Sequence, residues 1–437
     1  MGSRKKLAEV VGIDTTILLH ASRNKVDDIG PVLLVTPWYR PTIGGVAEVT
    51  ERLRGLLCGA GVQTFVWVCS DTSAVAEGHD QLPSWLRYRY VPSSVFHGAN
   101  LRSIVATLVH APAALLDAYN FLRKHRIRTV ILLYPMGYAW PFLILRSLRF
   151  IHLISSCHGN EILKFATSSR LARWLFSRVL YNSDAITVPA AHLPERAKEI
   201  APRRPLPIWI IPNCVNEEFF VPRPRGSPKA DRPTFIHISA FTPRKRTLDI
   251  VTAFSLARLP PNSRLLMVGA GPELASAKEL ARTLGVSDRV EFVGAPPDVR
   301  PYLWQSDVHV MASDEESGPI TLLEAMACEV PWIMTPWGIA MTLERGQYGI
   351  IVPGRVPEKM AEAMEDILKE PERLRTMGVR GRQKVVKEFS QARYLERHMT
   401  LIHAVKSGTA YAGIDYSASS TATSDQAQEV KESEPTT

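Results

Sequence analysis

Cysteine is scarce in this sequence, and its five copies are scattered singly without any C-x-x-C pair. A disulfide framework and a cysteine-based zinc site need paired or closely spaced cysteines, so this usage argues against both. It indicates reduced thiols and a cytoplasmic protein.

Long hydrophobic runs are also missing. The first 20 residues lack the apolar core and the small-residue cleavage site of a signal peptide. The strongest candidate for a membrane span, VILLYPMGYAWPFLIL (130–145), is shorter than the roughly 20 residues that a span needs and contains two prolines and a glycine. We interpret it as a buried strand that ends near Tyr134, followed by a new helix.

The composition is that of a globular protein with a modest excess of positive charge. The 437 residues are 46% hydrophobic and 22% charged, with a formal charge of +9. This length suffices for two or three domains. A basic balance suits anionic ligands, either phosphates or a negative membrane surface. The basic residues belong to no nucleic-acid recognition motif, so a nucleic-acid partner is not expected.

Short apolar runs alternate with helical periodicity through most of the chain. Continuous apolar strands interleaved with helices predict α/β architecture, with parallel sheets covered on both faces. The strand-like runs lie at 31–35, 63–68, 129–134, 151–155, 185–189 and 208–212, and then at 234–239, 264–269, 289–294, 308–312, 331–335 and 349–353.

The alternation is interrupted once, at residues 213–233, which contain four prolines and no periodicity. We interpret this segment as a linker. It divides the chain into two doubly wound, Rossmann-like domains, 30–212 and 234–385, which face a central cleft.

Three further segments lie outside these domains. Residues 386–405 follow the completed second domain, and we expect them to form a helix that packs back onto the first. Residues 1–29 and 406–437 are expected to be poorly ordered, the second because its Ser/Thr/Ala-rich sequence has almost no large apolar residues to bury.

Open α/β sheets bind ligands at the carboxyl ends of their strands. The run 308–312 is followed by ESGPITLLE (316–324), in which Gly318 permits close backbone approach and Pro319 is tolerated at a first helical turn. The free amides of Ile320, Thr321 and Leu322, together with the helix dipole, predict an anion site there.

Glu316 and Glu324 flank this anion site, one in the loop and one about a turn into the helix. Carboxylates accept hydrogen bonds from hydroxyls, so this arrangement suits a nucleotide sugar, with its diphosphate at the helix start. A pair of solvated surface acids is the alternative.

The block ESGPITLLEAMACEVPWIMT (316–335) resembles the E-x7-E block of retaining GT-B glycosyltransferases of the family 4, or group 1, type. The resemblance covers most of residues 31–395, and its blocks occur in the family's order. It implies that Glu316 contacts the donor sugar and Glu324 the ribose.

Two loops of the first half resemble further family blocks. Gly44 and Gly45, after the first strand, would let backbone amides approach a diphosphate or an acceptor, although a glycine pair is often only a turn. SSCHGNE (155–161) resembles the family's His-Gly block, which implies that His158 lies near the reacting carbon. A structural histidine is the alternative there.

Two loops of the second half also match. HISAFTPRKRT (237–247) implies that Lys245 pairs with the donor diphosphate as a point charge, unless it belongs to a solvated basic turn. The chain has Ala240 where the family usually has an arginine, and Arg244 or Arg246 could replace it. VGAGPE (268–273), which contains Gly269, resembles a family turn that lines one side of the nucleotide pocket.

The resemblance implies a hexosyltransferase that moves a sugar from a UDP- or GDP-sugar to a sugar or lipid-linked hydroxyl acceptor, with retention, in polysaccharide or glycolipid synthesis. No cofactor is expected beyond the donor. The chain has no D-x-D motif, and Lys245 with the helix start can carry the diphosphate charge, so no metal is expected. The rivals are a non-catalytic nucleotide-sugar-binding relative and an epimerase or phosphorylase on the same scaffold.

Three basic clusters in the first half, RYRY (87–90), RKHRIR (123–128) and RSLR (146–149), are interleaved with apolar residues. Such surfaces suit peripheral contact with the inner face of a membrane, where a lipid-linked acceptor would lie. Ordinary solvated helix ends are the alternative.

Overall fold

Strand β1 (Val32–Thr36) illustrates how the apolar runs become buried sheet. All five of its residues are buried, with Leu33 and Val35 in one core cluster and Val32 and Leu34 in another. Successive side chains of a strand point to opposite faces, so an uninterrupted apolar run requires cover on both faces.

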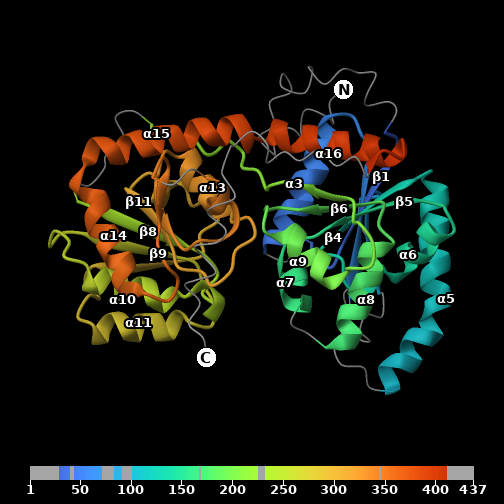
Figure 1. The fold of residues 1–437 in the computed structure, drawn as a ribbon, viewed down its shortest axis with the longest axis horizontal. Helices are drawn as coiled ribbons and strands as arrows, with labels where there is room; N and C mark the ends of the chain where they lie inside the picture. Colours follow the sequence, from blue (N-terminus) through green and yellow to red (C-terminus); the bar gives the residue numbers. More distant parts are fainter. Residues whose placement is uncertain are drawn as a thin grey trace.

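The computed structural model describes residues 29–39, 44–70, 83–90, 101–166, 169–224, 232–343 and 346–410. It contains two α/β domains side by side (Figure 1), each with a parallel sheet between helices. The α/β, GT-B architecture of two Rossmann-like domains is confirmed.

The first sheet has the strand order β3-β2-β1-β4-β5-β6-β7, and the second has the order β10-β9-β8-β11-β12-β13. The remaining strands of the first sheet are β2 (Thr64–Ser70), β3 (Leu86–Tyr90), β4 (Thr129–Leu133), β5 (His152–Ser156), β6 (Ala185–Val188) and β7 (Ile208–Ile210). Those of the second are β8 (Thr234–Ile238), β9 (Arg264–Val268), β10 (Val290–Gly294), β11 (Val308–Met311), β12 (Trp332–Met334) and β13 (Gly349–Ile351). Each of the twelve predicted runs overlaps a strand, although β1, β2 and β5 extend beyond their runs by one or two residues.

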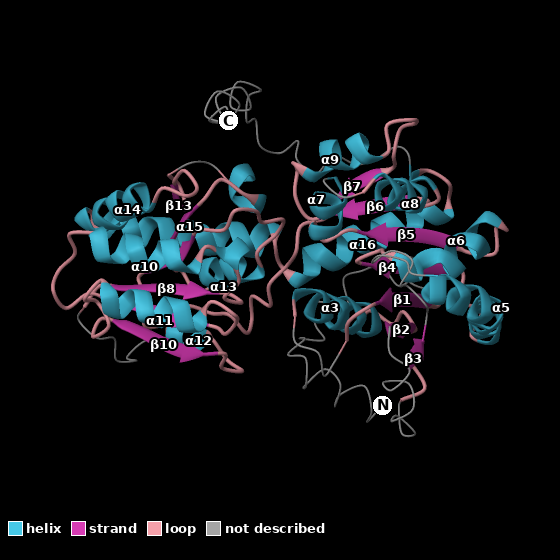
Figure 2. Cartoon of the chain, turned by 90° about the horizontal axis from the view of Figure 1, so that it is seen from below, coloured by secondary structure: helices cyan, strands magenta, loops and turns pink. Residues whose placement is uncertain are grey.

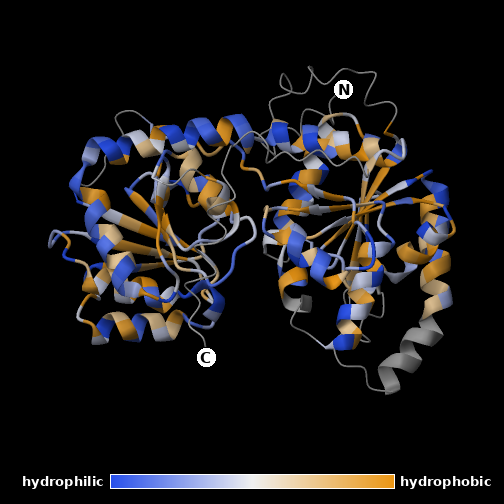
Figure 3. Cartoon of the chain, in the orientation of Figure 1, coloured by the Kyte–Doolittle hydropathy of each residue, from blue (hydrophilic) through white to orange (hydrophobic). Residues whose placement is uncertain are grey.

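The helices cover both faces of each sheet (Figure 2), and the hydrophobic strands lie inside (Figure 3). The first domain contains α3 (Gly45–Gly59), α5 (Leu101–Lys124), η3 (Gly137–Ala139), α6 (Trp140–Ser147), α7 (Asn160–Ala166), α8 (Arg170–Tyr181) and α9 (Leu193–Ile200). The second contains η4 (Pro243–Lys245), α10 (Thr247–Leu256), α11 (Leu274–Thr283), α12 (Arg300–Leu303), α13 (Ile320–Ala327), η5 (Gly338–Thr342), α14 (Pro357–Lys369) and α15 (Pro371–Glu388).

The last helix, α16 (Gln391–Lys406), follows α15 along one side of the molecule and lies on the first domain (Figure 1). Its apolar residues Leu395 and Ile402 belong to the same core cluster as Val32 and Leu34 of β1. Ser390 caps the helix by accepting a hydrogen bond from the Arg393 amide (3.4 Å). The chain therefore returns to the domain in which it began.

The terminal segments expected to be poorly ordered lie outside the described residues, except for residue 29 and residues 406–410. Ile29 and Ala410 are buried in the first-domain core, and the indole of Trp209 donates to the Ala410 carbonyl (3.1 Å). The segment 213–233 is likewise anchored where it is described, because Val215 is fully buried and pairs with Ser390.

Strand β3 escaped the sequence analysis because its charged residues alternate with aromatic ones and gave no continuous apolar run. It contains the RYRY cluster, and both Arg87 and Arg89 donate to the carboxylate of Asp117. Arg146, of another basic cluster, is paired with Asp184 (2.5 Å). Arg87 and Arg89 thus share one carboxylate, and Arg146 has one of its own, while peripheral membrane contact stays a prediction. No helix within the described part of the chain is long and apolar enough to cross a bilayer.

Candidate active site

The carboxyl ends of the two sheets face each other across the boundary between the domains. Figure 2 shows β5 and β6 directed toward the second domain and β8 directed toward the first. The loop after β11 touches the first domain, since a Cβ atom on Gly318 would lie 3.1 Å from Pro189 Cβ. The side-chain amide of Asn213, the first residue after that domain, donates to the Gly318 carbonyl (2.7 Å). A Cβ atom on Gly159 would lie 1.6 Å from the Ser317 hydroxyl oxygen. The predicted His-Gly and Glu-Ser-Gly blocks therefore meet directly.

Glu316 is the centre of the second-domain wall. It is only 6% exposed, and its Oε1 accepts hydrogen bonds from the Lys245 ammonium and the Ser313 hydroxyl (2.8 Å). Its Oε2 has no hydrogen-bond partner in the described structure. The two residues predicted to hold sugar and diphosphate are thus paired with each other, and one carboxylate oxygen is left to accept from a ligand hydroxyl.

The start of α13 provides backbone donors beside this pair. Pro319 occupies the N-cap, one position earlier than the first-turn position expected from the sequence. The prediction of a free Leu322 amide is wrong, because that amide donates to the Pro319 carbonyl (3.2 Å) and closes the first turn. The amides of Ile320 and Thr321 have no acceptor among the described residues. These two amides, with the helix dipole, make the helix start attractive to an anion.

Glu324 lies half-buried on α13 and faces the first domain rather than open solvent. Burial raises the pKa of Glu324 to about 7, with Glu48 adding to the rise and the positive charge of Arg52 opposing it. Arg52, on α3, also donates to the Cys214 carbonyl and to Glu48 (3.0 Å). The ribose contact of Glu324 remains a prediction.

His237, which the sequence analysis did not select, supports the loop that carries Lys245. It is fully buried, with one ring nitrogen bonded to the Val310 carbonyl (2.8 Å) and the other to the Ser239 hydroxyl (2.7 Å). Burial lowers the pKa of His237 to about 4, so the ring is neutral at physiological pH. In the sequence, His237 stands out as the one histidine within the apolar run TFIHIS, and this position could have identified it.

The glycine turn after β9 packs against this same loop. A Cβ atom on Gly269 would lie 1.8 Å from the Ser239 carbonyl oxygen, and one on Gly271 would lie 2.4 Å from that of Phe241. The Gly269 amide donates to the Gly294 carbonyl (2.6 Å). Both glycines therefore allow two backbone segments to touch, and Ala240 lies exposed between them.

The two arginines considered as replacements at Ala240 have different environments. Arg246 forms two hydrogen bonds with Asp249 (2.9 and 3.0 Å). Arg244 donates to the Glu315 carbonyl (2.9 Å) and lies near enough to Tyr134 of the first domain to oppose the burial-driven rise in the pKa of that phenol. Arg244 is thus the one whose charge reaches across the domain boundary.

The first-domain wall is built around His158, in the loop between β5 and α7. The ring is half-buried, and its Nε2 has no hydrogen-bond partner among the described residues. Burial lowers the pKa of His158 to about 4, with a smaller contribution from His398. The imidazole is therefore neutral, and its Nε2 is a buried nitrogen whose hydrogen-bonding capacity is unused among the described residues.

Glu161, also absent from the sequence predictions, lies at the start of α7 and holds this loop. Its side chain is fully buried, and its Oε1 accepts from the His158 amide. Its Oε2 has no partner in the described structure, and burial raises the pKa of Glu161 to about 7 against the effect of nearby backbone amides. In the sequence, Glu161 follows His158 by three residues, the spacing at which a glutamate in the first turn of a helix can accept from the amide before it. This spacing could have identified it.

Gly44 and Gly45 lie at the start of α3, where both are exposed and a Cβ atom would meet nothing within 4 Å. The space around them is open, as a ligand-binding loop requires. No group of three or more His, Cys, Asp or Glu residues in the described ranges is placed to hold a metal ion.

Comparison with known families agrees with this geometry. Residues 222–384 match the family model described as "Glycosyl transferases group 1", and residues 43–219 match "Glycosyltransferase Family 4". The chain is a group 1 glycosyltransferase.

This glycosyltransferase has relatives that act on different acceptors. It is 29% identical over 263 residues to the N-acetyl-alpha-D-glucosaminyl L-malate synthase of Bacillus anthracis, covering 58% of this chain and 68% of the relative. It is 27% identical over 383 residues to the GDP-mannose-dependent alpha-(1-6)-phosphatidylinositol monomannoside mannosyltransferase of Mycobacterium tuberculosis, covering 82% and 94%.

Among solved structures, Anabaena HepE in complex with UDP superposes on this glycosyltransferase with a TM-score of 0.68 at 14% identity. The match covers 86% of this chain and all of that one. At this identity the likeness establishes the shared fold alone.

Proposed function

We propose that this glycosyltransferase moves a sugar from a UDP- or GDP-sugar to a hydroxyl of a sugar or lipid-linked acceptor, with retention of anomeric configuration and without a metal ion. The observation that carries the proposal is the meeting of two loops. The loop that contains His158 contacts the loop that contains Glu316, beside the free amides at the start of α13.

The donor diphosphate suits the start of α13, where the amides of Ile320 and Thr321 supply hydrogen bonds. Lys245, 16% exposed, lies beside it with its charge matched to Glu316. When a diphosphate enters, the ammonium can exchange part of this pairing for the ligand. Glu316 Oε2 is then the acceptor for a sugar hydroxyl, as the family resemblance implies.

Transfer breaks the bond between the anomeric carbon and the diphosphate oxygen, and the electron pair leaves with the nucleoside diphosphate. Lys245, the α13 amides and Arg244 stabilise that growing negative charge. The acceptor oxygen forms the new bond on the face from which the phosphate departs, and its proton passes to the leaving phosphate. His158, being neutral, binds a sugar hydroxyl without repelling positive charge that develops on the ring.

The names of similar proteins bear on the nucleotide of the donor and on the acceptor. The Mycobacterium relative is GDP-mannose-dependent and extends a phosphatidylinositol mannoside, whereas the HepE structure contains UDP. The two names point to different nucleotides, so both UDP- and GDP-sugars are proposed as donors. A glycolipid is the acceptor that the longer match supports.

A transfer assay tests the proposal. The pure protein is incubated with radiolabelled UDP- and GDP-sugars and a lipid extract, with and without EDTA, and the product anomer is assigned by NMR. We expect labelled product both with and without EDTA, and we expect the product to keep the anomeric configuration of the donor. Donor binding without turnover would favour the non-catalytic rival. An inverted product would contradict retention, and loss of transfer in EDTA would contradict metal independence.

A further inference from the structure

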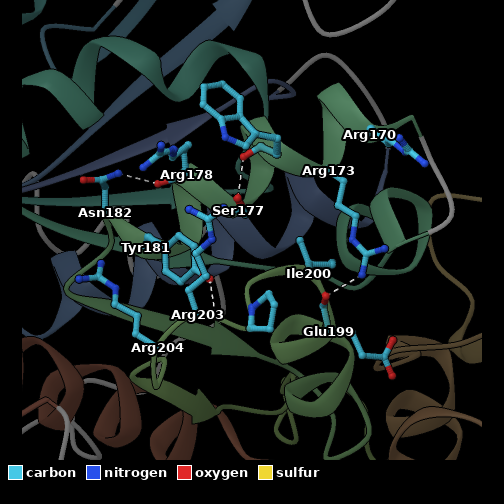
Figure 4. A pocket seen from close by; sticks show the side chains of 12 residues that line it. Arg170, Arg173, Ser177, Arg178, Tyr181, Asn182, Glu199, Ile200, Arg203 and Arg204 are labelled. Carbon is cyan, nitrogen blue, oxygen red and sulfur yellow. Dashed lines mark hydrogen bonds between the residues drawn. The ribbon is translucent and has the colours of Figure 1, made fainter.

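A basic groove lies on the first domain, apart from the loops described above. It has a volume of about 620 Å³ and runs between α8 and the segment after α9. Five arginines and a single glutamate line it, together with Trp174 and Tyr181 (Figure 4). The arginines are Arg170, Arg173, Arg178, Arg203 and Arg204.

The sequence of α8 places its charges in one stripe. Arg170, Arg173, Trp174, Arg178 and Tyr181 follow the spacing of three and four residues that defines a helix face. Its other face buries Phe176, Val179 and Leu180 in the first-domain core. The helix is thus fixed by its apolar face, and the arginine stripe has to face outward along the groove.

The groove is preformed because hydrogen bonds join its two walls. The Arg173 guanidinium donates to the Glu199 carbonyl (2.6 Å), and the Arg203 amide donates to the Tyr181 hydroxyl (2.7 Å). Figure 4 shows both links, one from α8 to Glu199 near the end of α9 and one from Arg203, after α9, to Tyr181 of α8. A ligand would find both walls already in position, which limits the entropy lost on binding.

The positive charge in the groove is not neutralised by the protein. Within the described ranges, none of the five guanidiniums forms an ion pair, and the Glu199 carboxylate is bonded to Arg196 (3.3 Å) instead. By contrast, Arg87, Arg89 and Arg146 of the same domain are all paired with carboxylates. Arg178 and Arg204 lie over the rings of Trp174 and Tyr181 (5.0 and 5.2 Å), contacts that leave their positive charge uncompensated. The groove therefore gathers cations without a carboxylate partner among the described residues.

We propose that this groove binds a phosphate-bearing ligand. Guanidinium groups match the oxygen geometry of phosphate and hold it by paired, charge-assisted hydrogen bonds. The arginines at the two ends of the α8 stripe, Arg170 and Arg178, are eight residues apart, which corresponds to about 12 Å along a helix. That span accommodates more than one phosphate group, or a phosphate with an attached ring beside Trp174, which is 48% exposed.

The phosphate has two sources that share this chemistry, a soluble oligophosphate and a lipid headgroup. The first is tested by calorimetric titration with inorganic pyrophosphate. The second is tested by flotation with vesicles of phosphatidylglycerol, compared with vesicles of phosphatidylcholine. The groove variant is Arg178→Gln/Arg204→Gln, and a second pair, Arg170→Gln/Arg178→Gln, covers the case in which the first folds poorly.

A matched control removes the same two charges elsewhere. Arg375→Gln/Arg380→Gln changes two exposed arginines of α15 in the second domain. We expect the groove variant to bind pyrophosphate, or anionic vesicles, at least roughly tenfold more weakly than wild type, while the control binds as wild type does. Whichever probe responds identifies the source of the phosphate.

The proposal is overturned if the groove variant binds both probes like wild type, or if the control loses binding to the same extent. Pyrophosphate also suits the donor site, so a second binding event is expected in all three proteins. That event belongs to the proposed function, and its absence would count against the donor site without affecting the comparison at the groove.

Discussion

The two sides of the domain boundary differ in their electrostatics. On the second-domain side, the two residues nearest the contact, Lys245 and Glu316, carry opposite charges and pair with each other. Glu324, farther along α13, differs from them, because burial raises its pKa to about 7. The first-domain wall carries groups that burial drives toward neutrality, since the pKa of His158 falls to about 4 and that of Glu161 rises to about 7.

Under the proposed function, the two sides would serve different parts of one ligand, the ionic diphosphate and the neutral sugar. Paired charges can be exchanged for a diphosphate without leaving an ion unpaired in a buried site. Neutral polar groups can bind sugar hydroxyls and tolerate positive charge that develops on a ring. If this division is correct, removing charge from one wall and neutral groups from the other should have different consequences.

The largest effect is expected from Glu316→Gln. This change keeps the shape of the side chain but removes the negative charge that holds Lys245 and the strong acceptor for a sugar hydroxyl. We expect transfer to fall by about 10³-fold, in the range seen when one oriented polar group of an active site is lost. The rate of radiolabelled sugar transfer measures it. Glu315→Gln, one residue earlier, is the control, and an active Glu316→Gln enzyme would remove Glu316 from the mechanism.

The next effect concerns Glu161 and the pH dependence of stability. Below pH 4.5 the carboxyl is protonated in both folded and unfolded chains. As the pH rises toward 7, only the unfolded chain ionises, so stability is lost until the folded group also ionises at about 7. The loss amounts to about 3 kcal/mol.

The glutamine of Glu161→Gln cannot ionise. Between pH 5 and pH 8 the melting temperature of this variant should therefore fall by roughly 5–10 °C less than that of wild type. Exposed Glu199→Gln should behave as wild type. Equal slopes in all three proteins would show that Glu161 is ionised or protonated alike in both states.

A smaller effect is expected from Gly159→Ala, which tests the contact between the walls. The added Cβ atom would collide with Ser317, and the positive φ of 111° is unfavourable for alanine. We expect the rate of sugar transfer to fall by roughly 30-fold. Gly285→Ala also has a positive φ, of 68°, which lies in the left-handed region that alanine adopts at small cost, and a Cβ atom there meets nothing within 4 Å among the described residues. It should keep full activity.

The double variant Gly159→Ala/Ser317→Gly removes the side chain that the new methyl group would meet. We expect it to recover most of the lost transfer, because only the backbone strain remains. If the double variant is as slow as Gly159→Ala alone, the contact with Ser317 is not what limits the enzyme.

The smallest effect is expected from Lys245→Gln, which should weaken binding of UDP or GDP about tenfold through loss of a charge-assisted hydrogen bond. Calorimetry against both nucleotides measures it and also identifies the preferred base. Lys359→Gln, at an exposed pair with Glu362, is the control. Unchanged nucleotide affinity would place the diphosphate away from Lys245.

The sequence by itself determined the two sheets and the loops that carry chemistry. Continuous apolar runs such as 129–134 and 308–312 can be buried only in sheets covered on both faces, and parallel strands bring their carboxyl ends to one edge. The positions of His158, Lys245 and Glu316 after such strands follow from this rule.

Only the tertiary structure decided which groups meet and how burial changes them. Glu161 and His237 became visible through the pKa shifts and hydrogen bonds that burial imposes. The contact between Gly159 and Ser317 joins residues far apart in the chain and depends on how the two domains are set against each other. Local patterns report the period of a strand or helix, whereas desolvation and contacts between domains depend on the whole fold.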